Sequence, residues 1–158
     1  MREKTTLVVF SSDLDKIIAA FNIAIGSASM DMDVTMFFTF WGLNVLRKKR
    51  SVKKHISLLK RLLNFFNREG ADRLKLSKFN MMGMGTYMMK LLMKKSKMPS
   101  VQELITLAKE LGIKLIACST TMEMLGVKSE DLIPEVNTIA GVSTYISNAK
   151  QSKINLFI

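Results

Sequence analysis

The chain is short of cysteine and histidine, and these shortages exclude whole classes of protein. Among its 158 residues there is one cysteine and one histidine. A single cysteine excludes an intramolecular disulfide, so nothing in the sequence indicates an oxidising compartment. One thiol and one imidazole also argue against a zinc site, which needs three or four such ligands. We therefore expect no bound metal.

Long hydrophobic runs are missing as well. The longest uncharged stretches run from Ile17 to Met30 and from Val34 to Leu46, which is shorter than the roughly 18–20 residues that a membrane-spanning helix needs. Near the N-terminus the apolar run is only LVVF, too short for the core of a signal peptide. We expect a cytoplasmic protein, and the length suits a single domain over residues 1–158.

Positive charge is plentiful but unevenly distributed. The net charge is +11, and residues 47–97 hold 16 of the 24 basic residues but only two acidic ones. The basicity therefore belongs to an insert at about 47–97 and not to the whole chain. Such a segment suits an acidic partner, an anionic membrane or nucleic acid.

Outside this insert, short apolar runs alternate with segments of helical pattern. The runs are continuous rather than alternating, which is typical of strands covered on both faces. Strands are predicted at 5–10, 33–42, 113–117 and 153–158, with a further short strand or turn after 136. The order of elements predicts an α/β fold, a three-layer α/β/α sandwich with a mostly parallel sheet of about five strands.

The insert itself has the pattern of a basic amphipathic element rich in methionine. Residues 56–66 carry apolar side chains at helical spacing, and seven of the 13 methionines lie between Met81 and Met98. As a helix, the second half would place methionine and leucine on one side and lysine on another. The apolar side would hold Met84, Met88, Leu91 and Leu92, and the basic side would hold Lys90, Lys94 and Lys97. We interpret them as a partner, self-association or peripheral membrane surface, or simply a solvated face; nucleic acid is disfavoured because no aromatic stacking motif is present.

The only cysteine, Cys118, stands where a buried strand is expected to meet a helix. Functional crevices of parallel sheets lie beyond the carboxyl ends of the strands. Ser119 or Thr120 is expected to cap the helix, with Thr120 and Glu123 as a capping box. The thiol would then face unpaired helix N–H groups, which favour a thiolate. The alternative is that Cys118 is a small buried hydrophobe, as most lone cysteines are.

Other residues at the expected strand ends are candidate pocket positions. Ser11 and Ser12 follow the first strand, while Trp41 and Gly42 end the second. They could equally be turn and cap residues only. His55, in a basic helical run, is interpreted as solvated or half-packed and not as a catalytic partner of the cysteine.

The glycines of GMGTYM, Gly83 and Gly85, match only part of a dinucleotide-binding fingerprint. The third glycine is missing and no apolar strand precedes them. We predict that they serve backbone flexibility and close packing, and we expect no cofactor.

Several motifs together resemble a known group of proteins. The segments ACSTTMEMLGVKSEDLI, GVSTYI and INLFI are similar to the DsrE/DsrF/DsrH-like sulfur-relay superfamily. With FFTFWGLNVLRK and the Met-Gly-Met-Gly element, the chain resembles its single-cysteine branch, often labelled peroxiredoxin-like or oxidoreductase. The resemblance runs from Thr6 to Ile158 and implies an α/β/α sandwich, homo-oligomerisation and a Cys118 that carries sulfur as persulfide or thiosulfonate. Relatives with a second functional cysteine have no counterpart here, and Leu115 stands where a peroxidatic motif has threonine.

These observations support three hypotheses for the function. The leading one is a sulfur carrier or sulfurtransferase-like protein, in which Cys118 takes sulfane sulfur from a small donor or sulfur-carrier protein and passes it to a partner thiol. Helix N–H groups beside Ser119 and Thr120 would stabilise the anion. The second is a non-enzymatic oligomeric adaptor that binds membrane or protein through the Met-rich helix. The third is a thiol oxidoreductase, which would need a resolving thiol from another molecule.

Overall fold

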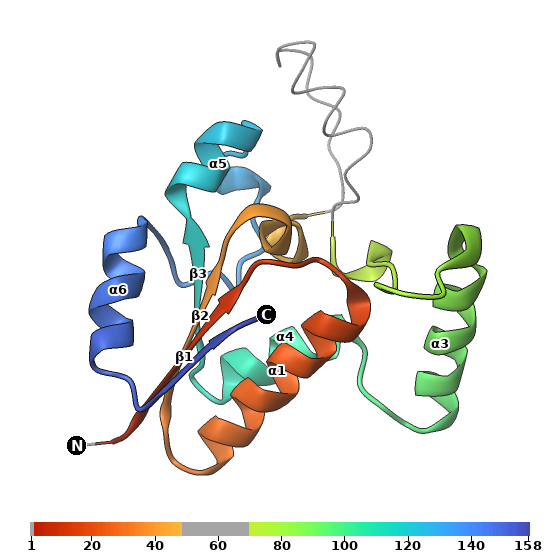
Figure 1. Ribbon diagram of the computed structural model, residues 1–158, viewed down its shortest axis with the longest axis horizontal. Coiled ribbons are helices and arrows are strands. Elements are labelled where there is room, and N and C mark those ends of the chain that lie inside the picture. Colours follow the sequence, from red (N-terminus) through yellow and green to blue (C-terminus); the bar gives the residue numbers. More distant parts are fainter. Residues whose placement is uncertain (1, 49–69) are drawn as a thin grey trace.

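Five parallel strands form the centre of the computed structural model, which describes residues 2–48 and 70–158 (Figure 1). The strands are β1 (Lys4–Val9), β2 (Asp33–Phe38), β3 (Lys114–Cys118), β4 (Thr138–Ala140) and β5 (Ile154–Phe157). They lie side by side in the order β4-β3-β2-β1-β5, and each neighbouring pair is parallel. The predicted α/β class and parallel sheet are confirmed.

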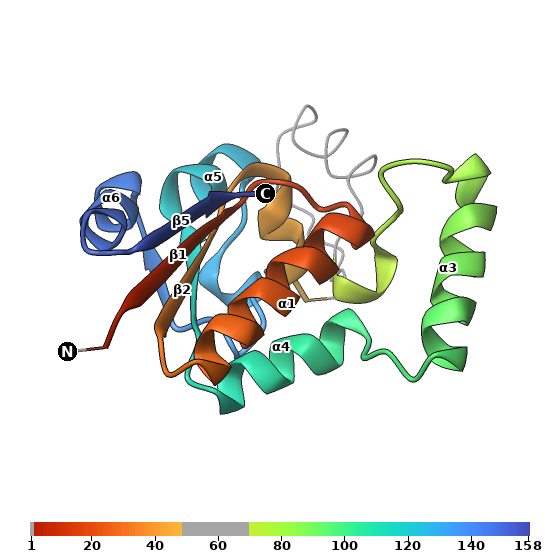
Figure 2. The ribbon, with the colours of Figure 1, turned by 60° about the horizontal axis from the view of Figure 1, so that its bottom comes forward.

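Helices cover both faces of this sheet and complete three layers (Figures 1 and 2). On one face α1 (Leu14–Ser29) packs beside α4 (Val101–Glu110), and on the other lies α6 (Val142–Lys150). A short helix, α5 (Ser119–Leu125), continues directly from the end of β3. The chain turns through short 3-10 helices elsewhere: η1 (Phe40–Leu46), η2 (Ala71–Arg73), η3 (Met81–Gly83) and η4 (Ser129–Asp131).

The two faces of the sheet are buried to different depths. Met36 and Phe38 of β2 belong to the large core under α1 and α4, whereas Phe37 points to the opposite face. There Phe37 forms a small cluster with Ile116 and Cys118, and no residue of α6 above it is fully buried. The continuous apolar strands thus support a thick layer on one side and a thin one on the other.

The helix boundaries follow from recognisable start and stop signals. At the start of α4, the Glu103 backbone N–H donates to Ser100 Oγ, and the Ser100 backbone N–H donates to the Glu103 carboxylate, a complete capping box. Gly112 and Gly126 follow α4 and α5 with positive φ, which glycine adopts without strain. The helix predicted around residues 13–30 is α1.

The second predicted strand is too long. β2 ends at Phe38, and of the residues predicted to extend it to Gly42, Thr39 precedes η1 while Phe40, Trp41 and Gly42 belong to η1. The chain crosses the end of β1 here, where the Gly42 backbone N–H donates to Phe10 O at 2.8 Å. A Cβ on Gly42 would stand 2.1 Å from Val9 O, so only glycine allows this crossing. The apolar side chains of 43–46 are buried by this turn and not by sheet pairing.

The methionine-rich segment forms α3 (Met84–Lys95), as its periodicity predicts, and this helix stands apart from the sandwich (Figures 1 and 2). Its start is fixed by Thr86, whose hydroxyl donates to Asn80 Oδ1 and accepts from the Leu76 backbone N–H. Gly83 has φ 104°, and a Cβ on Gly85 would lie 1.7 Å from Phe79 O. Both glycines therefore serve the backbone, as predicted.

The first half of the predicted insert, with His55 and the apolar positions 56–66, lies outside the described residues. Within the described ranges, no helix combines the length and the apolar character that crossing a bilayer requires.

The close passage of Gly42 over Val9 gives a direct test of the fold. Gly42→Ala should lower the free energy of unfolding by at least about 2 kcal/mol, because the new methyl group overlaps the backbone of β1. Gly26→Ala is the matched control: this glycine lies within α1, and a Cβ there meets nothing within 4 Å. That substitution should raise stability by about 0.5–1 kcal/mol. Urea denaturation of both variants measures the difference; equal midpoints would contradict the crossing.

Candidate functional site

Cys118 is at once the last residue of β3 and the N-cap residue of α5. The prediction that Ser119 or Thr120 caps this helix, with a Thr120–Glu123 capping box, is wrong, because the helix starts one residue earlier than expected. Ser119 and Thr120 are instead its first two helical residues. The sulfur is therefore carried by the residue from which the unpaired N–H groups of the first turn begin.

Two threonine hydroxyls that the sequence did not single out complete the surroundings of the sulfur. Thr39 follows β2 and Thr121 lies in the first turn of α5, and their Oγ1 atoms are 3.0 Å apart. The Phe40 backbone N–H also donates to Thr121 Oγ1, at 3.1 Å. Phe38 pairs with Ala117 in the sheet, so the next residues, Thr39 and Cys118, come level with each other.

The polar hydrogens around Cys118 lower the pKa of its thiol. Burial alone raises that pKa, but hydrogen bonds from Thr121, through both its hydroxyl and its backbone N–H, act in the opposite direction. The Thr39 hydroxyl and the Thr120 backbone N–H add to them, and the net result is a pKa below the ordinary value. A hydrogen bond to the charged form of a group favours that form, so these donors stabilise the thiolate.

A count of hydroxyl protons shows that the threonine pair can still donate to the sulfur. Thr39 and Thr121 share one hydrogen bond, in which one hydroxyl donates and the other accepts. Thr121 Oγ1 also accepts from the Phe40 N–H. One of the two hydroxyl protons therefore remains available for the sulfur. The pair forms a preset donor for a thiolate.

Cys118 lies at the expected strand–helix junction, but its side chain is buried, as in the alternative of a small buried hydrophobe. The residue is only 2% exposed and lies in the small cluster with Phe37 and Ile116. Half-buried Ala140 and Tyr145 pack against this cluster, and the Tyr145 ring lies 5.5 Å from that of Phe37. The cause is the direction of the side chain, which points to the α6 face of the sheet. The thiol is thus covered by the thin layer of the sandwich, on the α6 side of the sheet.

The other predicted pocket residues lie on the loops at the same edge. Thr120 is exposed and acts on the sulfur through its backbone N–H, while half-buried Ser119 lies beside Gly141. Trp41 is 43% exposed on η1, whereas Gly42 is buried against Val9. Of this group, Thr120 has an identified effect on the sulfur.

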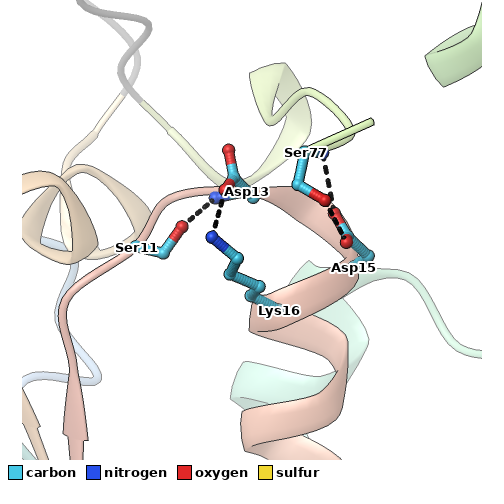
Figure 3. A network of polar contacts seen from close by, with 5 residues as sticks. All are labelled: Ser11, Asp13, Asp15, Lys16 and Ser77. Atoms are coloured by element: carbon cyan, nitrogen blue, oxygen red, sulfur yellow. Dashed lines mark hydrogen bonds and ion pairs between the residues drawn. The ribbon is translucent and has the colours of Figure 1, made fainter. Parts of the chain in front are cut away.

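The serines after β1 belong to a different network, at the start of α1 (Figure 3). Ser11 Oγ accepts a hydrogen bond from the Asp13 backbone N–H at 3.0 Å, and Asp13 pairs with Lys16 at 2.8 Å. Next to them the Asp15 carboxylate accepts from both the backbone N–H and the hydroxyl of Ser77. Ser11 therefore orders the helix start, and half-buried Ser12 follows it in the same turn.

The surface residues predicted on the Met-rich helix separate into two groups. Met84 and Met88 are 56% and 58% exposed on α3. Lys90 and Lys94 lie on the same helix, while Lys97 lies just beyond its end, and all three lysines line a pocket. Met84 and Met88 do not line this pocket, whereas Met93 and Met98 do. The partner or membrane role of these surface residues stays a prediction.

No metal ligand set appears in the described part of the chain, where three His, Cys, Asp or Glu side chains never come together. The fold and site together define a class: a parallel α/β sandwich with one low-pKa thiol at a strand–helix junction on the carboxyl edge of its sheet. A family model described as DsrE/DsrF/DrsH-like matches residues 1–157, and the chain belongs to this family.

Individual proteins extend this comparison. The chain is 42% identical over 156 residues to the uncharacterized protein YrkE of Bacillus subtilis, covering 99% of this chain and 97% of that protein. It is 31% identical over 163 residues to the sulfur carrier protein DsrE2 of Allochromatium vinosum, with 99% of both chains covered. The crystal structure of the ychN protein from E. coli shares the fold, with a TM-score of 0.58 and 10% identity over the full length of both chains.

Thr121 should control the ionisation of Cys118. We predict that Thr121→Val moves the midpoint of the iodoacetamide alkylation rate against pH to a higher value, because it removes a hydroxyl that stabilises the thiolate. At neutral pH the variant should therefore alkylate more slowly than the wild type.

Two companion variants separate this effect from general damage to the site. Thr121→Ser retains a hydroxyl and should restore the wild-type midpoint. Thr120→Val retains the backbone N–H through which that residue acts, so its midpoint should stay unchanged. A shift of equal size in Thr120→Val would contradict the assigned role of Thr121.

Proposed function

We propose that this protein is a sulfur carrier, in which Cys118 accepts sulfane sulfur and passes it to the thiol of a partner. The observation that carries the proposal is a lone cysteine whose pKa is lowered by hydroxyl and backbone donors at the start of a helix. Membership of the DsrE/DsrF/DrsH-like family supports it, as does 31% identity with a protein named as a sulfur carrier.

The chemistry is a pair of displacement reactions at sulfur. The Cys118 thiolate attacks the outer sulfur of a persulfide donor, forming a new S–S bond while the donor S–S bond breaks and the donor leaves as thiolate. The second step reverses these roles: a partner thiolate attacks the outer sulfur, and Cys118 leaves as thiolate. No net oxidation or reduction occurs, and a low leaving-group pKa favours the second step.

The donors around Cys118 suit both steps. They stabilise the thiolate before it attacks and again when it departs, because the same hydroxyl and N–H groups face the sulfur in both states. The backbone N–H groups of Thr120 and Thr121 are fixed by α5 and need no rearrangement during the reaction.

Access to the sulfur requires the α6 layer to move. Cys118 is buried in the isolated chain, but no residue of α6 is fully buried and β4 is an edge strand of three residues. Segments with little buried apolar surface open at small free-energy cost. We infer that a shift of Tyr145 and α6 exposes the thiol to a donor or a partner.

The partners follow from charge and compartment. The net charge of +11 favours an acidic sulfur-carrier protein or a small anionic sulfane donor, which the field of the protein would attract. Nucleic acid is disfavoured as a partner because the sequence has no aromatic stacking motif. We place the protein in the cytoplasm, where a lone thiol stays reduced.

Tetrathionate provides a direct test of sulfur loading. Incubation with it should add one S₂O₃ group to Cys118, releasing thiosulfate, and intact-mass spectrometry should show a single adduct that a reductant removes. The rate should rise with pH through the lowered pKa of the thiol, because the thiolate is the attacking species. Cys118→Ser should give no adduct, since the chain has no other cysteine.

A second arm tests the access route. Tyr145→Ala removes a side chain that packs against the Cys118 cluster, so it should speed adduct formation without moving the pH midpoint. A wild-type Cys118 that gains no adduct, while the unfolded chain does, would overturn the carrier proposal.

A second candidate function rests on the exposed methionines of α3. Exposed methionines are typical of a surface that a protein partner covers, because methionine adapts to irregular apolar surfaces. We propose self-association through this face as the main alternative, in which the protein is an oligomeric adaptor and Cys118 is structural. Peripheral membrane contact would use the same helix. The third alternative, a thiol oxidoreductase, would need a resolving thiol from a second molecule.

Self-association through α3 should depend on Met84 and Met88. The double variant Met84→Gln, Met88→Gln should shift the sedimentation equilibrium toward the monomer, because both side chains are more than half exposed and would become polar. Met30→Gln is the control, as Met30 is 78% exposed but lies after α1. A wild-type chain that is monomeric at high concentration, or an assembly that neither variant alters, would contradict the assignment.

A further inference from the structure

A second site lies between α3 and the start of α4, apart from Cys118. A pocket of about 790 Å³ occurs there, within the size range of small-molecule sites. Figure 2 shows α3 standing beside α1 and α4, joined to α4 by the chain around residues 96–100. None of the residues that surround the sulfur of Cys118 lines this pocket.

The pocket combines an apolar wall with a cationic rim. Met93, Val101 and Leu107 contribute apolar side chains, and the first two are buried. Lys90, Lys94 and Lys97 recur at helical spacing along the same side of α3 and its C-terminal turn. Asp72 and Glu103 line the pocket as well, so the three lysines leave it with a small excess of positive charge. An apolar interior with such an excess suits an amphipathic ligand that carries a negative headgroup.

Among the described residues, neither acid of the pocket lining forms an ion pair with Lys94 or Lys97. Glu103 lines the pocket too, but its carboxylate accepts hydrogen bonds from the Ser100 backbone N–H and hydroxyl, both at 2.7 Å. Lys90 is held in place by donating to the Asp72 backbone O. Lys94 and Lys97 have no ion-pair partner among the described residues.

The backbone at Lys97 has a conformation that is unusual for a residue with a side chain. The Lys97 N–H donates to Lys94 O and the Met98 N–H donates to Met93 O, which is the Schellman pattern that ends a helix. Lys97 occupies the left-handed position of this motif, with φ 53°, where glycine is the usual residue. A lysine that lines the pocket therefore occupies a position where glycine would be less strained.

We propose that this pocket binds an amphipathic organic anion: an aliphatic chain against Met93 and Leu107, with its acidic headgroup held by Lys94 and Lys97. Methionine side chains adapt to a flexible chain. The lysine ammonium group is a mobile point charge and can bind either a carboxylate or a phosphate headgroup.

Decanoate is the first probe, titrated into the full chain by calorimetry. Decanoate should bind at one site. Decanol lacks the acidic headgroup and acetate lacks the aliphatic chain, so each should bind at least about tenfold more weakly. With ¹³C-methyl methionine, the Met93 and Met98 signals should shift on binding, while those of Met84 and Met88 stay in place.

Three variants test the role of the lysines. Lys94→Gln and Lys97→Gly should each weaken decanoate about tenfold, the loss expected for one hydrogen bond to a charged group. Lys95→Gln is the matched control, because it removes the same charge from a neighbouring residue that does not line the pocket. Lys97→Gly should also raise the melting temperature, since glycine adopts positive φ without strain. Cys118→Ser should bind as the wild type does.

Several results would overturn the proposal. These are no binding of decanoate, equal weakening in Lys95→Gln, or multisite binding that shifts Met84 and Met88 as well. Binding to vesicles of anionic phospholipid without binding to free decanoate would assign the lysines to a membrane surface instead. A lower melting temperature for Lys97→Gly would show that Lys97 serves the turn and not a ligand.

Discussion

The parallel pairing of β2 with β3 is the constraint on which the thiol site depends. It sets Phe38 against Ala117, and so brings Thr39 level with Cys118 on the α6 face of the sheet. Successive residues of a strand point to opposite faces, so a slip of one residue would send one of the two side chains into the main core. The hydroxyl pair that lowers the pKa of the thiol is thus held by sheet register, which in turn is fixed by the large core under α1 and α4.

Burial of Cys118 raises the pKa of its thiol, while the nearby hydrogen-bond donors lower it. The sulfur lies under the thin α6 layer, where both effects act. A thiol under the thick layer would lie far from polar donors, and its pKa would rise. A thiol open to water would gain little from two threonine hydroxyls, because water would compete for them. Cys118 lies beneath half-buried Tyr145, where its hydrogen-bond donors are shielded from most water and the cover is the one we propose to be displaced. The unequal depth of the two sheet faces therefore suits the proposed chemistry at Cys118.

The sequence predicts the scaffold better than the site. Continuous apolar runs predicted the parallel sheet, and the junction at Cys118 was visible because a strand pattern changes there to a helix pattern. Thr39 and Thr121 were not recognisable, since they lie 82 residues apart and meet only through strand pairing. A threonine directly after an apolar strand is the one available signal, and it is weak. The end of β2 was missed for the same reason: η1 is apolar because it is buried, while Gly42 is required by a backbone that the local sequence does not reveal.

Backbone strain links the two sites. Phe40 has φ 45° and Lys97 has φ 53°, conformations that cost L-residues about 1–2 kcal/mol. At Phe40 the strained turn directs a backbone N–H to Thr121 Oγ1 and so helps to hold this hydroxyl beside Thr39. At Lys97 the strained turn places an ammonium group at the pocket mouth. Asp31, Phe79, Met81 and Met82 also have positive φ, and three of these four immediately precede α3. Glycine would relieve the turn at Lys97 but would remove a positive charge from the pocket lining, so stability and the proposed binding make opposite demands on this position.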